Sequence, residues 1–123
     1  MNTPDDGRAP AVEHAASGAH AWRSAVHAQL AATRDHVDFY ALTGDVVETL
    51  RSLSGLAGLL VGQVATYGRG RGLRDDVPGH DPAERLAIAS SWAAQLQHDL
   101  DRAERTANQL WNEISHIAVE DLS

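Results

Sequence analysis

The 123-residue chain contains no cysteine and no lysine, and only 5% of its residues are aromatic. Without cysteine, neither disulfide bonds nor thiolate chemistry is available, and the redox compartment cannot be read from the sequence. The apolar residues are mostly Ala and Leu, which fill a β-sandwich poorly but suit helices that approach closely. The composition therefore predicts an all-α protein of one domain.

Long hydrophobic runs are also missing. The most apolar stretch, residues 53–65, is roughly 13 residues long, whereas a membrane-spanning helix needs about 20. The first residues, Met-Asn-Thr-Pro-Asp-Asp, lack the charged and then apolar pattern of a secretory signal. We expect a cytoplasmic protein with no membrane partner.

Positive charge is scarce, because the formal net charge is −7. A dedicated duplex-DNA binder normally carries a basic face, so this balance argues against that class of protein. A local basic site remains compatible with it.

The strongest pattern in the chain is an apolar row with alternating spacings of three and four residues, in which large and small side chains trade places. Such a row is typical of long, close helix–helix packing, as in coiled coils. Its members are Leu86, Ala89, Ala93, Leu96, Leu100, Ala103, Ala107, Leu110, Ile114 and Ile117.

Start and stop signals predict three helices, at about 13–42, 45–67 and 82–119, after a disordered tail at 1–12. Gly44 resembles a helix stop, and Asp45 resembles the cap of the next helix. Asp81 followed by Pro82 is the clearest helix start. The expected architecture is a three-helix bundle, residues 13–123, in which the second and third helices form a hairpin.

The apolar rows exceed what one thin bundle can cover, so we expect a homodimer that forms a larger bundle. The second helix also repeats small residues at every fourth position, which favours a neighbouring backbone at close range. The expected interface and packing residues are Ser54, Gly58, Gly62, Trp92, Leu96, Leu100, Leu110, Trp111 and Ile114.

The loop at residues 67–74 carries the only concentrated positive charge. Arg69, Arg71 and Arg74 lie on a glycine-rich backbone beside Tyr67, a composition found in segments that grip phosphates and stack bases. Three arginines neutralise few phosphates, and two Asp residues follow directly. The alternatives are a weak nucleic-acid contact and a solvated hairpin loop.

Glu113 and His116 have the Glu-x-x-His spacing of ferritin-like di-iron ligands. The match covers four residues, and the other helices offer few inward-facing carboxylates, so surface roles are the alternative. No nucleophile has a plausible base and orienting partner. The sequence therefore predicts no cofactor and no enzyme activity, but an adaptor, scaffold or regulatory subunit that acts through a homodimeric bundle.

Overall fold

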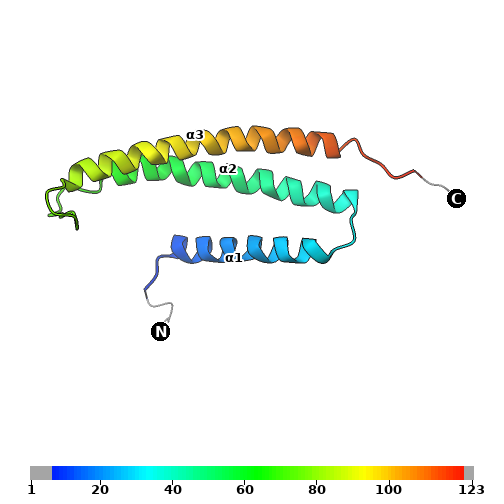
Figure 1. Cartoon of the computed structure of the whole chain (residues 1–123), viewed down its shortest axis with the longest axis horizontal. Coiled ribbons are helices and arrows are strands. Elements are labelled where there is room, and N and C mark those ends of the chain that lie inside the picture. Colours follow the sequence, from blue (N-terminus) through cyan, green and yellow to red (C-terminus); the bar gives the residue numbers. More distant parts are fainter. Residues whose placement is uncertain (1–6, 121–123) are drawn as a thin grey trace. The chain divides into compact units, whose positions relative to one another are not determined.

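The computed structural model describes residues 7–120, which form three α-helices and, within this range, no strand (Figure 1). Helix α1 spans Pro10–Ala31, α2 spans His36–Thr66 and α3 spans Pro82–Ile114. The all-α fold class is thus confirmed. The chain divides after Arg34 into two compact units, α1 and the α2–α3 hairpin, and each is described by itself.

Helix α1 begins inside the segment that was expected to be a disordered tail. Pro10 is its first residue, where the missing N–H of proline costs nothing, and Glu13 in the first turn pairs with Arg8 at 3.2 Å. None of its side chains is buried, and Val26 and Leu30 are both exposed. Residues 1–6 of the expected tail lie outside the described residues.

The break between the first two helices lies at residues 32–35, and not at Gly44 as predicted. Asp35 caps α2, because its carboxylate accepts a hydrogen bond from the Val37 backbone N–H at 3.0 Å. The expected cap Asp45 and the expected stop Gly44 both lie inside α2. Gly44 leaves room for a neighbouring side chain, since an added Cβ would meet the Trp111 ring at 3.0 Å.

Helix α3 starts as the sequence predicts, at Pro82, with the Asp81 carboxylate accepting from the Ala83 N–H at 3.0 Å. It ends at Ile114 and does not reach residue 119. The last turn tightens, because the N–H of His116 bonds to the carbonyl of Glu113, and the Ser115 hydroxyl donates to the carbonyl of Asn112.

Helices α2 and α3 pack along their length as an antiparallel hairpin (Figure 1). Three facing pairs, Ser54 with Asp101, Gly58 with Gln97, and Gly44 with Trp111, fix the register. One step forward along α2 therefore matches one step backward along α3, and residue 56 lies level with residue 99. At 1.5 Å per residue, each helix is about 45–50 Å long.

Candidate interaction surface

The side of α2 that faces α3 carries both small and polar residues. Val47 and Ala57 are almost fully covered, and the hydroxyl-bearing Thr43 and Ser54 are each 7% exposed. The apolar row that the sequence predicts for this helix has seven members, and one of them, Ala57, is buried as expected; Val47 and Ser54 instead lie one residue after a row member. The row consists of Val46, Leu50, Leu53, Ala57, Leu60, Val64 and Tyr67. Helix α2 is therefore rotated so that Leu53 and Leu60 are exposed while Ala57 stays covered.

Helix α3 is rotated in the same way. Alternate members of its long apolar row face the hairpin, and Ala107 is buried. Leu96 and Leu110 instead remain 50% and 55% exposed. Gln97 and Trp111, which directly follow these two leucines, are less exposed, and so are Ser90 and Glu104, which follow Ala89 and Ala103 of the row.

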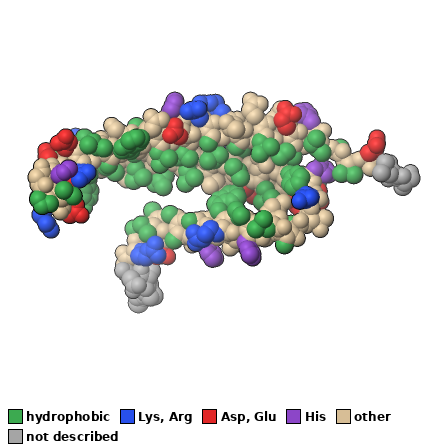
Figure 2. Space-filling view, viewed as in Figure 1, with side chains coloured by type: hydrophobic (Ala, Val, Ile, Leu, Met, Phe, Trp, Pro, Cys, Tyr) green, Lys and Arg blue, Asp and Glu red, His purple; other side chains and the backbone are tan. Residues whose placement is uncertain are grey.

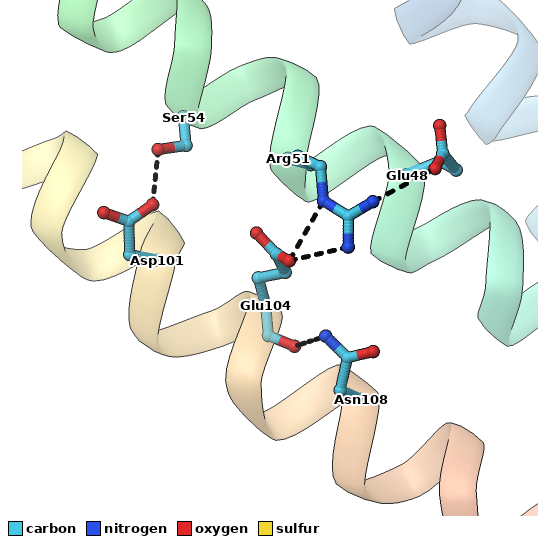
Figure 3. Close-up of polar contacts among 6 residues, drawn as sticks. All are labelled: Glu48, Arg51, Ser54, Asp101, Glu104 and Asn108. Atoms are coloured by element: carbon cyan, nitrogen blue, oxygen red, sulfur yellow. Dashed lines mark hydrogen bonds and ion pairs between the residues drawn. The ribbon is translucent and has the colours of Figure 1, made fainter.

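Polar contacts explain this rotation (Figure 3). The Ser54 hydroxyl donates to the Asp101 carboxylate at 2.5 Å, and the Arg51 guanidinium donates two bonds to Glu104, at 3.0 and 3.1 Å. Arg51 also contacts Glu48 at 3.3 Å. We call Arg51, Ser54, Asp101 and Glu104 the polar face. These side chains can form their hydrogen bonds with one another only when α2 and α3 are rotated so that this side of each helix faces the other helix.

The opposite edge of the hairpin is apolar and open. Figure 2 shows hydrophobic side chains gathered along one long edge of the hairpin, with charged side chains and histidine on the other. We call this surface the leucine face. All of its members are exposed, Trp92 to 69%, and they are Leu53, Leu56, Leu60, Trp92, Leu96 and Leu110.

Helical geometry places the leucines of both helices on the same side. Leu53 and Leu60 each precede a covered position of α2, and Leu96 and Leu110 each precede a covered position of α3. In an antiparallel pair of helices, the residues that directly precede the positions in contact lie on the same side of the pair in both helices. The leucine face is thus one continuous two-helix surface.

The row of small residues on α2 plays a different role from the one predicted. A Cβ added at Gly58 would lie 2.7 Å from the amide nitrogen of Gln97, so this glycine permits a close approach within the hairpin. At Gly62, nothing lies within 4 Å of an added Cβ. Ser54 is a buried hydrogen-bond donor rather than a gap.

An aromatic cluster closes the end of the hairpin farthest from the loop. The Tyr40 and Trp111 rings are 5.4 Å apart and tilted by 39°, and Gly44 lies against the indole. Among the described residues, the buried Trp111 Nε1 has no hydrogen-bond acceptor. Trp111 therefore packs within the hairpin, whereas Trp92 lies on the leucine face.

The arginine loop holds its central cation internally. Arg71 donates to the Tyr67 carbonyl at 2.8 Å and lies over the Tyr67 ring, 4.4 Å from its centre. Arg69 and Arg71 also line a cavity of about 380 Å³ next to Asp81, whose carboxylate caps α3. The structure does not bring Arg74 to that cavity. A nucleic-acid contact at this loop stays a prediction.

Asp75 anchors the loop to the start of α3. Its carboxylate accepts from the Val77 backbone N–H at 2.8 Å and from the Arg85 guanidinium at 2.7 Å. The side chain is 3% exposed. The Val77 hydrogen bond and then the Arg85 contact lower the pKa of Asp75 below its ordinary value of 3.8.

The structure places Glu113 in the last turn of α3, and His116 beyond the helix; both are exposed. Within residues 7–120, no three His, Asp or Glu side chains gather closely enough to hold a metal ion. The single Glu-x-x-His pair therefore lacks the further ligands that a bundle metal site needs.

None of the three described helices combines the length and hydropathy that crossing a bilayer requires. Comparison with known proteins gives no match to a family model, a curated protein or a solved structure.

Proposed function

We propose that this chain is a non-enzymatic helical assembly protein, such as an adaptor, scaffold or regulatory subunit, that acts through a homodimeric bundle. The observation that carries the proposal is that the hairpin places polar side chains between its helices and large apolar side chains on its surface. It covers Ser54, Gln97 and Glu104 between its helices and leaves Leu53, Leu96 and Leu110 outside.

An open apolar surface of this kind is costly to leave in water. Fully burying one leucine side chain is worth about 1.5–3 kcal/mol, and the face presents several. Scattered surface leucines need no explanation, but a continuous apolar strip bordered by polar residues is typical of an interaction site. The leucine face has this pattern along both helices.

The size of the face also suits a partner protein. Two helices about 45 Å long and packed roughly 10 Å apart present on the order of 900 Å². A standard specific interface covers about 800 Å² on each partner. A surface of this length matches helices better than it matches a small ligand, which binds in a concave pocket.

Light scattering of the full chain over a wide concentration range tests the proposal. We expect a molar mass above that of the 13.2 kDa chain, approaching twice this value as concentration rises. A mass that stays at one chain at the highest concentration would contradict a homodimeric bundle.

A further inference from the structure

We propose that the leucine face binds a second copy of this chain with the two α3 helices antiparallel, the two-fold axis crossing α3 between residues 99 and 100. This inference rests on the proposed function and specifies its surface, partner and register. A shallow hollow on α3, lined in part by Ala103, indicates the register.

The hollow has the residues of a knob-into-hole site. It measures about 460 Å³ and is lined by Asp99, Arg102, Ala103, Arg105 and Thr106. Four of these lie three, four and seven residues apart, at 99, 102, 103 and 106, which is the diamond that receives one side chain of a facing helix. Ala103 is the one small apolar residue of this lining, so a leucine can approach the helix there.

The α3 row supplies the side chain that fits. Leu96 is large and half-exposed, and lies seven residues from Ala103 on the same side of the helix. If Leu96 of a second copy occupies the hollow, then the reverse contact forms as well, because a two-fold interface repeats every contact. The same register places Leu110 opposite Ala89 of the second copy. Each leucine then meets an alanine.

Helix α2 is consistent with the same axis. The hairpin register places residue 56 level with residue 99, so an axis near residue 99 crosses α2 near residue 56. The axis between residues 99 and 100 crosses α2 between residues 55 and 56, so Leu53 lies about 2.5 residues before it and Leu60 about 4.5 residues after it. Leu53 therefore lies within about two residues, or 3 Å, of the level of Leu60 of the second copy. The midpoint of Leu53 and Leu60 thus differs from the axis of α3 by about one residue, or 1.5 Å along the helix.

Charges at the edge favour antiparallel over parallel pairing. Asp99 and Arg102 lie beside the axis, and Asp99 also accepts a hydrogen bond from Gln95 at 2.9 Å. In the antiparallel arrangement each Asp99 lies near Arg102 of the other copy. A parallel arrangement would bring Asp99 beside Asp99 and Arg102 beside Arg102, which is unfavourable.

Distances between spin labels test this register directly. The chain has no cysteine, so His98→Cys and Asn112→Cys each carry one label, on an exposed strip of α3 away from the leucine face. In the antiparallel dimer, the residue-98 positions of the two copies are offset by about 5 Å along the helix axis, and the residue-112 positions by about 37 Å. We therefore expect a markedly longer distance at residue 112 than at residue 98.

The outcomes separate this proposal from the proposed function. Equal distances at the two sites in a dimeric sample would indicate parallel helices, and would overturn the register while leaving a homodimeric assembly protein. A shorter distance at residue 112 would overturn it as well. If the sample has the mass of a single chain and gives no intermolecular distance, both the register and the proposed homodimeric assembly are overturned. The leucine face would then be covered by α1 or by a different protein.

Discussion

At the scale of single residues, the polar side chains determine which way the helices turn. Ser54 is buried and Asp101 partly buried between α2 and α3, so an unpaired carboxylate there would lose part of its solvation without compensation. The hydrogen bond between them therefore specifies the packing as well as stabilising it.

Replacing Ser54 with Ala should lower the free energy of unfolding by about 1–3 kcal/mol, because it leaves the Asp101 carboxylate without its donor. Urea denaturation at one fixed protein concentration measures the change. Ser52→Ala, an exposed position on the same helix, is the matched control and should have little effect. Equal losses for the two variants would contradict a specific role for Ser54.

Asp75 makes the loop sensitive to acid. Because folding lowers the pKa of this carboxyl, its stabilisation is complete above the ordinary value of 3.8 and is lost as pH falls through the lowered value. Protonation weakens the bonds to Val77 and Arg85, so the loop should open before the helices melt.

Asp75→Asn should reproduce this opening at neutral pH. Hydrogen exchange should be several-fold faster at the amides of Val77 and His80, which the Asp75 turn orders. Asp76→Asn removes the same charge from the next residue and should leave both amides protected. Unchanged exchange in Asp75→Asn would show that Asp75 does not hold the loop.

At the scale of the helices, the sequence specifies some ends well and others poorly. Asp81 and Pro82 mark the start of α3 correctly, because a cap and a first-turn proline act locally. Gly44 also looks like a local stop, but Trp111, distant in sequence, uses the space that this glycine leaves. Only the tertiary contact shows why α2 continues through it.

The facing sides of the helices show the same limit. Periodicity identifies the helices and their apolar rows. On each helix, however, the row one residue further along has the same spacing, so periodicity alone does not decide which of the two rows faces the other helix. The pairs Arg51–Glu104 and Ser54–Asp101 select between them, and these pairs exist only once both helices are placed. As a result, Leu96 and Leu110 of the predicted apolar row are exposed on the hairpin.

The two glycines provide a test of helix packing. Gly62→Ala should stabilise the protein by about 0.5–1 kcal/mol, because alanine favours helix and nothing obstructs its Cβ. Gly58→Ala should gain less, since the Gln97 side chain must move from its position 2.7 Å away. Thermal unfolding compares them. A loss of stability at Gly62 would indicate a neighbouring backbone there, as the row of small residues originally suggested.

At the scale of the whole molecule, the hairpin has two different edges. The polar face makes its hydrogen bonds within the hairpin, whereas the leucine face is exposed and, on our proposal, is covered by a second copy of the chain. Substitutions on the two edges should therefore act differently. A charge on the leucine face should affect association while leaving the helices of the single chain intact.

The measurement that tests this account most directly is the molar mass of Leu96→Asp beside that of His98→Asp, by light scattering across a wide concentration range. Both residues are exposed on α3, but Leu96 lies on the leucine face and His98 on the outer side. The account predicts that Leu96→Asp keeps its helical content and stays at the mass of one chain. Its dimer dissociation constant should be at least about tenfold higher than that of His98→Asp, which should associate as the unaltered chain does. Equal association of the two variants would contradict the leucine face as the interface.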